Sequence, residues 1–203
     1  MILIGRFGSP FVRRVAITLR LYGIEHEHRA LSSSGEDRAT LQTINPLARV
    51  PALITDDGET LVDSATILDY LDRLVGPEKA LTPADGSART KVMALLGLAT
   101  GAVEKSISAY YERNKRPEEK WHHPWLDTLL EQSKDGFEAV DKAAASPWLI
   151  GDKITQADVS TVAFWEFAVL RTRPEGAPAM NCPNITAIAD RANALPAFLE
   201  TKP

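Results

Sequence analysis

The chain has 203 residues, of which 44% are hydrophobic and 25% charged, a composition typical of a globular protein with one large or two small domains. Its 23 basic and 27 acidic residues give a net charge of −4, which argues against nucleic acid as the main partner, because phosphate binding needs a clustered basic surface. Cys182 is the only cysteine, so an internal disulfide and a cysteine-based metal motif are excluded, and a reducing, cytoplasmic compartment is expected.

The first 31 residues predict a strand, a helix and a second strand. MILIG, at residues 1–5, lacks the basic start and long apolar run of a signal peptide, so we interpret it as a short strand and expect no membrane-spanning segment. PFVRRVAITLRLYG, at 10–23, places apolar residues at helical spacing and ends on a glycine. IEHEHRAL, at 24–31, alternates as a strand does, and the two strands of such a unit are expected to be parallel.

The next segment predicts a hairpin followed by a helix. PALIT and TLVDS are two strand-like runs separated by DDGE, in which Asp57-Gly58 is a strong turn signal. The helix is expected to begin with Ser64 as its N-cap and to end at Gly76. Its expected buried residues are Ile67, Leu68, Leu71, Leu74 and Val75. The order β-α-β, then β-β-α, matches a thioredoxin-like domain over residues 1–76.

Residues 77–87, rich in proline, glycine and small polar residues, are interpreted as a linker. The remaining chain, 88–203, shows no clear strand alternation, so we expect an all-helical domain. It contains one long helix ending near residue 115, another over 124–145, and a last helix with a tail over 182–203. Thr155 and Asp158 fit the first and fourth positions of a capping box before a helix that is apolar nearly all round.

Ser9, in GSPFVRRV, is the first candidate for chemistry. It is expected to cap the helix that begins at Pro10, since serine is a preferred N-cap and proline a preferred first helical residue. Its hydroxyl proton remains available to a group beyond the helix N-terminus, where anions are favoured. A thiol placed there would ionise more easily. No histidine–acid relay accompanies Ser9 in the sequence, so we do not expect it to be a nucleophile.

Two further positions complete a pattern. If Val50-Pro51 has a cis bond, which the sequence leaves open, the backbone of Val50 is free to pair with an extended peptide. At Asp63-Ser64 a helix N-terminus and a hydroxyl suit a carboxylate, and the acid beside them suits an ammonium. A carboxylate and an ammonium on one carbon form the head of an amino acid. Together the three positions predict a short peptide carrying a thiol.

At this point the sequence resembles the cytosolic glutathione S-transferases, of the bacterial serine-type kind. The resemblance is carried by four motifs in order, which together extend over nearly the whole chain: SPFVRRV (9–15), NPLARVPAL (45–53), LVDSATILDYL (61–71) and LIGDKITQADVS (149–160). It implies a thioredoxin-like N-terminal domain, a helical C-terminal domain that forms the electrophile side of the cleft, glutathione bound between them, and a homodimer.

The resemblance also implies roles for individual residues. Ser9 is the thiol-activating residue, Val50 is the backbone partner before Pro51, and Asp63 with Ser64 is the γ-glutamyl site. Arg49 matches a position that is often basic and near the glycine carboxylate. Position 63 is often glutamate or glutamine in relatives, so the shorter Asp63 puts the strength of that contact in question.

The electrophile site is expected on the long helix, where Tyr110, Tyr111 and Arg113 occur in AYYERNK, together with Phe164 on the apolar helix. Tyr110 and Arg113 are three residues apart and share a helix face. Core packing is the competing interpretation of each aromatic residue. No metal is expected, because His26 and His28 share a strand face without a third ligand.

The sequence therefore predicts a glutathione S-transferase that activates the thiol for attack on a small electrophile. One alternative is an isomerase or dehalogenase of the same fold that uses glutathione as a cofactor. The other is a non-enzymatic interaction or stress protein that keeps the fold.

Overall fold

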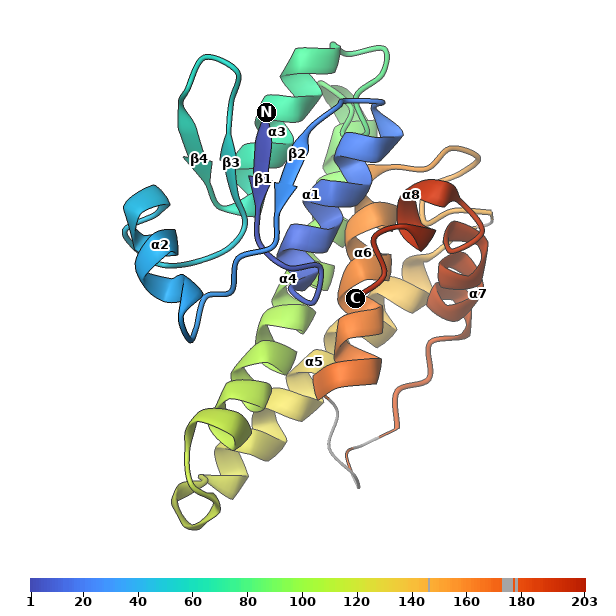
Figure 1. The fold of residues 1–203 in the computed structure, drawn as a ribbon. Helices are drawn as coiled ribbons and strands as arrows, with labels where there is room; N and C mark the ends of the chain where they lie inside the picture. Colours follow the sequence, from blue (N-terminus) through green and yellow to red (C-terminus); the bar gives the residue numbers. More distant parts are fainter. Residues whose placement is uncertain (146, 173–176, 178) are drawn as a thin grey trace. The chain divides into compact units, whose positions relative to one another are not determined.

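The computed structural model describes residues 1–145, 147–172, 177 and 179–203 (Figure 1). The chain forms two compact units, one made of residues 1–84 and 193–203 and the other of residues 85–192. The expected domains, 1–76 and 88–203, assign the C-terminal segment to the helical part, whereas residues 193–203 group with the first unit. Each unit is described by itself.

The first unit contains a four-stranded sheet in the order β2-β1-β3-β4. The strands are β1 (Ile2–Ile4), β2 (Glu27–Arg29), β3 (Ala52–Ile54) and β4 (Thr60–Val62). Strands β1 and β2 are parallel, as predicted, and β3 runs antiparallel to both β1 and β4. The predicted turn is also confirmed: Gly58 has a φ of 88° and donates its N–H to the carbonyl of Thr55 at 3.1 Å.

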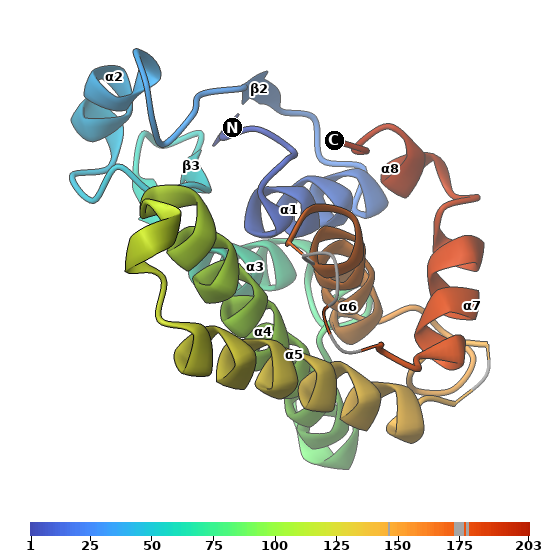
Figure 2. The same ribbon diagram turned by 90° about the horizontal axis from the view of Figure 1, so that it is seen from below.

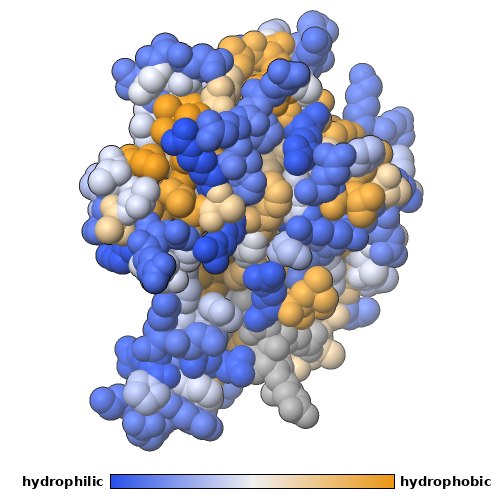
Figure 3. Space-filling model, viewed as in Figure 1, coloured by the Kyte–Doolittle hydropathy of each residue, from blue (hydrophilic) through white to orange (hydrophobic). Residues whose placement is uncertain are grey.

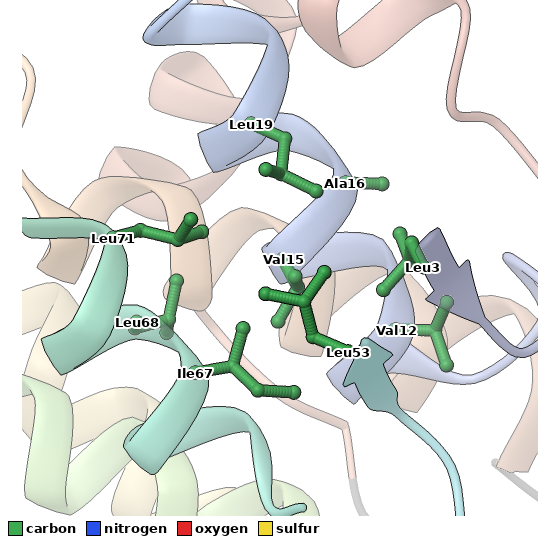
Figure 4. Packing of buried hydrophobic residues seen from close by; sticks show 9 residues of the cluster. All are labelled: Leu3, Val12, Val15, Ala16, Leu19, Leu53, Ile67, Leu68 and Leu71. Atoms are coloured by element: carbon green, nitrogen blue, oxygen red, sulfur yellow. The ribbon is translucent and has the colours of Figure 1, made fainter. Parts of the chain in front are cut away.

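The sheet separates two apolar layers, because successive side chains of a strand point to opposite faces. Leu3 and Leu53 pack with α1 (Pro10–Leu21) and α3 (Ser64–Val75) on one face (Figure 4). Ile4 and Ala52 pack with Leu41 of α2 (Asp37–Ile44) on the other. Helices α1 and α3 therefore share one side of the sheet, and α2 lies on the opposite side (Figure 2).

Helix α1 has the ends and the apolar stripe that the sequence predicts. Ser9 is its N-cap, Pro10 occupies the first helical position, and Gly23, with a φ of 67°, follows the C-cap. Val12, Val15, Ala16 and Leu19 are fully buried. The intervening polar residues, among them Arg13, Arg14 and Thr18, are buried as well, so the middle of the helix is covered all round.

Three local predictions are corrected by the structure. Helix α2 was not expected; it buries only Leu41. The N-cap of α3 is Asp63, not Ser64, because the Asp63 carboxylate accepts the N–H of Ala65 at 2.7 Å. Leu74 was expected to be buried but is 51% exposed, since the covered stripe ends one turn before the helix does.

The elements that the structure describes in the second unit are all helices. They are α4 (Gly86–Lys115), η1 (Glu118–Lys120), α5 (His123–Ala143), α6 (Gln156–Phe167), η2 (Ala168–Thr172) and α7 (Pro183–Ala192). Helices α4 and α5 lie side by side in both ribbon views (Figures 1 and 2). A Cβ on Gly136 of α5 would lie 2.8 Å from that of Ala102 on α4, so this glycine permits their close approach.

The capping box of α6 is confirmed. The side chains of Thr155 and Asp158 each bond to the backbone of the other, and residues 156–164 are all buried. Helix α6 packs against α4 and α7 within this unit. The apolar character noted in the sequence is therefore that of a core helix.

Helix α4 is long and apolar enough, by length and composition, to cross a membrane. Its buried residues, however, face α5 and α6, which makes it a core helix of the helical unit. The surface around the connection from α4 to α5 is mainly hydrophilic (lower end of Figure 3) and contains seven charged residues between 112 and 120.

The C-terminal segment contains two helices where the sequence predicts one helix and a tail. Helix α7 ends at Ala192, and α8 (Pro196–Leu199) begins after Leu195. Proline at residue 196 removes a backbone donor, which favours the start of a new helix over continuation of the old one. Helix α8 packs against α1 in the first unit, with Phe198 fully buried.

Candidate functional site

Strand register brings three of the predicted segments to one end of the sheet. Ile4 of β1 pairs with Ala52 of β3, and Ala52 pairs with Val62 of β4. The chain leaves β1 after Ile4, enters β3 before Ala52 and leaves β4 after Val62. The loop to Ser9, the Val50-Pro51 step and the start of α3 therefore lie at the same end of the strands, which we call the sheet edge.

Ser9 is held in place by its backbone. Its N–H donates to the carbonyl of Arg6 at 3.0 Å, and its Oγ accepts the N–H of Val12 at 3.4 Å. The second contact lies at the long end of a hydrogen bond. The hydroxyl proton is not used by this cap, so it can be donated to a group in front of the helix.

The loop before Ser9 is fixed by strand β2. The N–H of Gly5 donates to the carbonyl of Arg29 at 2.9 Å, and the carbonyl of Gly5 is 2.7 Å from Nε2 of His28. The His28 ring also stacks on Phe7 with centroids 4.2 Å apart and planes within 3°. His28 thus supports this loop, a role that the search for metal ligands did not suggest.

Gly5 allows the Val50 segment to approach α1. Gly5 has a φ of 128°, and a Cβ there would lie 2.5 Å from Cγ2 of Val12 and 2.9 Å from Cβ of Val50. No larger residue fits without displacing one of them. The Val50-Pro51 step therefore packs directly against the region where α1 begins.

The Val50-Pro51 bond is cis. Neither the N–H nor the C=O of Val50 has a hydrogen-bond partner among the residues that the structure describes. The preceding loop is held by Asn45, whose Nδ2 donates to the carbonyl of Arg49 at 2.8 Å and whose Oδ1 accepts the N–H of Leu47 at 3.1 Å. Asn45 is 1% exposed, and in the sequence it is recognisable only as the first residue of the NPLARVPAL motif, although Asn-Pro is a recognised turn signal.

The start of α3 is more elaborate than predicted. Asp63 has a φ of 72°, and its carboxylate caps the helix through Ala65. Ser64 is 2% exposed, and its Oγ accepts hydrogen bonds from Arg14, at 3.1 Å from Nε and 2.6 Å from Nη2. In the sequence Arg14 is recognisable only as part of the SPFVRRV motif, because its partner is 50 residues away. Arg49 is exposed and lies in the loop that leads to Pro51.

The predicted electrophile residues all lie in the helical unit. The ring centroid of Tyr110 is 6.0 Å from that of Tyr111 and 6.5 Å from that of Phe167. The guanidinium of Arg113 lies over Trp121, 5.7 Å from its centroid. Phe164 is fully buried, so its ring forms part of the core around α6. These residues remain a prediction for the electrophile site.

No cluster of three histidine, cysteine or acidic side chains suited to a metal ion occurs in the described part of the chain. The carbonyl of Ile24 lies 3.0 Å from Nδ1 of His26, and burial lowers the pKa of that imidazole. The polar groups at the sheet edge are instead serine hydroxyls, backbone amides, an arginine and a carboxylate. This set suits an organic ligand with charged ends.

Family comparisons agree with that reading. Residues 3–79 match the model for the glutathione S-transferase N-terminal domain, and residues 103–200 match the model for the C-terminal domain. All four motifs quoted from the sequence lie within these two ranges.

Individual proteins of known name are similar over nearly the full chain. A maleylacetoacetate isomerase from Pseudomonas aeruginosa is 29% identical over 198 residues, which cover 94% of this chain and 90% of that protein. The crystal structure of a glutathione S-transferase from Methylobacterium radiotolerans, in complex with glutathione sulfonate, superposes with a TM-score of 0.89 at 25% identity, covering 100% of this chain and 94% of that one.

A glutathione transferase family member from Pseudomonas fluorescens Pf-5, with bound glutathione, has a TM-score of 0.85 at 29% identity and covers 100% of this chain and 98% of its own. The βαβ-ββα sheet of the first unit and the helices of the second are the two domains of this fold. The chain belongs to the glutathione S-transferase family.

Proposed function

We propose that this protein binds glutathione at the sheet edge of its first unit and activates the thiol for reaction with a small electrophile. The observation that carries the proposal is the paired row Ile4, Ala52 and Val62, from which Ser9, Val50 and Ser64 emerge on one side. Two of the solved relatives contain glutathione or glutathione sulfonate, which supports the same ligand here.

Each group has a distinct part in this proposal. The unpaired backbone of Val50 forms an antiparallel pair with the cysteinyl residue of glutathione. Ser64 binds the carboxylate of the γ-glutamyl group, and Asp63 lies beside its ammonium. Arg49 lies toward the glycine carboxylate. Ser9 donates its hydroxyl proton to the sulfur.

The expected gain in thiol acidity is substantial. A helix N-terminus stabilises a nearby anion by about 0.3–1 kcal/mol, and a hydrogen bond to a charged acceptor contributes about 1.5–3 kcal/mol. Together these amount to roughly 1.5 to 3 pKa units below the ordinary thiol value of about 8.5. Much of the bound glutathione is then thiolate at neutral pH, which is the reactive form.

The test is a pH titration of bound glutathione, followed by thiolate absorbance in the ultraviolet, in the wild type and in Ser9→Ala. We expect the wild type to show a depressed thiol pKa and Ser9→Ala to bind with the pKa restored to near its free value. Ser34→Ala removes a serine in an exposed loop and is the matched control. A Ser9→Ala variant with an unchanged thiol pKa would remove Ser9 from the mechanism.

We propose that Tyr110, Tyr111, Arg113 and Phe164 contact or support the electrophile. Tyr110 and Arg113 offer a phenol and a guanidinium, which suit an electrophile that carries polar groups. Rate enhancement then comes from holding the thiolate and electrophile together and from stabilising developing charge.

A second candidate is a glutathione-dependent isomerase. It is favoured by the full-length similarity to the Pseudomonas aeruginosa maleylacetoacetate isomerase. Thiol counting separates the two: conjugation consumes one glutathione per turnover, whereas isomerisation returns it. With maleylacetoacetate as substrate, turnover at constant free thiol supports isomerisation, and loss of thiol with a chloronitrobenzene supports conjugation.

We further propose that the protein is a cytoplasmic homodimer. The single, buried cysteine fits a reducing compartment. Sedimentation equilibrium at micromolar concentration tests the dimer, and a mass of one chain contradicts it.

A further inference from the structure

The pair formed by Arg14 and Ser64 has a chemical consequence that goes beyond packing. Arg14 is 3% exposed and Ser64 is 2% exposed, so bulk water does not compete for their contact. Nε and Nη2 of Arg14 both donate to the Ser64 oxygen, at 3.1 and 2.6 Å. The Arg14 guanidinium is itself held over the Phe11 ring, 5.6 Å from its centroid.

A serine hydroxyl has two acceptor lone pairs and one proton. Both donors belong to one edge of the guanidinium and reach the Ser64 oxygen from the same side, so the hydroxyl proton must point away from Arg14. The buried cation therefore orients Ser64 as a hydrogen-bond donor toward a third group.

The neighbouring backbone acts in the same direction. Ser64 is the first residue of α3, so its own N–H has no partner within the helix. The next N–H, that of Ala65, is already bound by the Asp63 carboxylate. The ligand thus meets the hydroxyl and the N–H of one residue, which are two donors.

We propose that Arg14 is a positioning residue that makes Ser64 selective for a carboxylate over a neutral carboxamide. A carboxylate accepts at both oxygens, whereas a carboxamide presents an NH₂ group that has no acceptor to meet. This inference rests on the proposed function, because the carboxylate concerned is that of the γ-glutamyl group of glutathione.

The experiment compares the dissociation constants of two ligands by calorimetry on the full chain: glutathione and its analogue with the γ-glutamyl α-carboxylate converted to a carboxamide. We expect the wild type to prefer glutathione by about tenfold or more, the ratio between one charge-assisted and one neutral hydrogen bond. In Arg14→Met the Ser64 hydroxyl can rotate and accept, so the ratio falls to about threefold or less.

Three further variants keep the test decisive. Arg14→Lys retains a buried cation but not the two-point contact, and it should also lower the ratio, which covers the case that Arg14→Met does not fold. Ser64→Ala should lower the ratio by itself, and adding Arg14→Lys to it should change the ratio no further. Arg73→Gln removes an exposed arginine of α3 and should leave the ratio at the wild-type value.

The outcomes separate this inference from the proposed function. If the wild type binds neither ligand, the proposed function fails and the inference with it. If the wild type binds both and the Arg14 variants weaken both affinities equally, Arg14 only supports the fold and the inference is wrong. A change in the ratio alone supports it.

Discussion

Ser9 caps its own helix through a long contact, although serine is a favoured N-cap residue. Its Oγ is 3.4 Å from the N–H of Val12, whereas the cap of α3 by Asp63 measures 2.7 Å. We expect Ser9→Ala to lower the free energy of unfolding by less than about 1 kcal/mol, and Asp63→Ala by about 1 kcal/mol or more. Urea denaturation measures both. A larger loss in Ser9→Ala than in Asp63→Ala would show that the Ser9 cap is the stronger one.

Cys182 is expected to be unreactive in the folded protein. It is 4% exposed, and burial, together with the nearby charge of Asp141, raises the pKa of its thiol to about 12. Only the thiolate reacts with iodoacetamide, so alkylation at pH 8 should be roughly a thousandfold slower than in the urea-unfolded chain. Mass spectrometry over time measures both rates. Comparable rates in the two states would contradict this prediction.

A residue whose partners are far away in the chain is harder to recognise from the sequence than one beside a helix start. Ser9 and Ser64 stand beside helix starts, so a local pattern indicates them. Arg14 acts through a serine 50 residues away, which no local pattern contains. Asn45 binds backbone groups only two and four residues along the chain, in a turn that its Asn-Pro pair could have indicated. The choice of Asp63 over Ser64 as the cap also escaped prediction, because both residue types are good caps and the positive φ of Asp63 is set by tertiary structure.

Elements with a long apolar stripe or a strong turn signal were predicted from the sequence, whereas helix α2 was not. Helix α1 shows a clear stripe, and strands β3 and β4 flank an Asp-Gly turn. Helix α2 is only eight residues long and buries only Leu41, so the stretch is too short for a helical repeat of apolar residues to be recognised. Its position is set by the opposite face of the sheet, where Leu41 meets Ile4 and Ala52.

The capping box at the start of α6 was predicted from the sequence, and its acid is held by several hydrogen bonds. Asp158 is fully buried and accepts three hydrogen bonds, from the N–H of Leu149 at 2.7 Å, the N–H of Thr155 at 2.8 Å and the hydroxyl of Thr155 at 2.7 Å. Burial raises the pKa of this carboxyl, and these hydrogen bonds oppose that shift. We therefore expect Asp158 to stabilise the fold mainly through the hydrogen bonds that its oxygens accept, and less through its charge.

We expect Asp158→Ala to lower the free energy of unfolding by about 3 kcal/mol, because it leaves buried donors without acceptors. Asp158→Asn keeps one oxygen and should lose less. Thermal and urea denaturation of both variants test the order. Equal stability of Asp158→Ala and the wild type would show that water replaces the carboxylate.

At the scale of the whole molecule, the C-terminal segment belongs to the same unit as the N-terminal residues. After the helical unit, residues 193–203 pack with the first unit, where α8 contacts α1 and the guanidinium of Arg20 lies 3.5 Å from the Glu200 carboxylate. The sequence predicts the thioredoxin-like and the helical parts, but not the packing of residues 193–203 with the first. A short helix that begins at Pro196 contains no signal for a partner more than 170 residues earlier.

We expect Phe198→Ala to destabilise the protein by about 3 kcal/mol, as for other fully buried aromatic side chains. Leu199→Ala alters the adjacent residue, which is 56% exposed, and should change the free energy of unfolding by less than about 0.5 kcal/mol. Urea denaturation of the two variants compares them directly. If Phe198→Ala is as stable as Leu199→Ala, the segment adds nothing to the first unit.

The paired row Ile4, Ala52 and Val62 also bears on how sequences of this family diverge. Strand pairing uses backbone atoms, which every residue except proline supplies in full. The spacing between Ser9, Val50 and Ser64 is therefore inherited with the sheet and survives substitution of most side chains around it. The fold is kept between this chain and solved relatives that are 25–29% identical to it. The side chains of the proposed ligand site can therefore change one at a time without loss of the arrangement that the sheet provides.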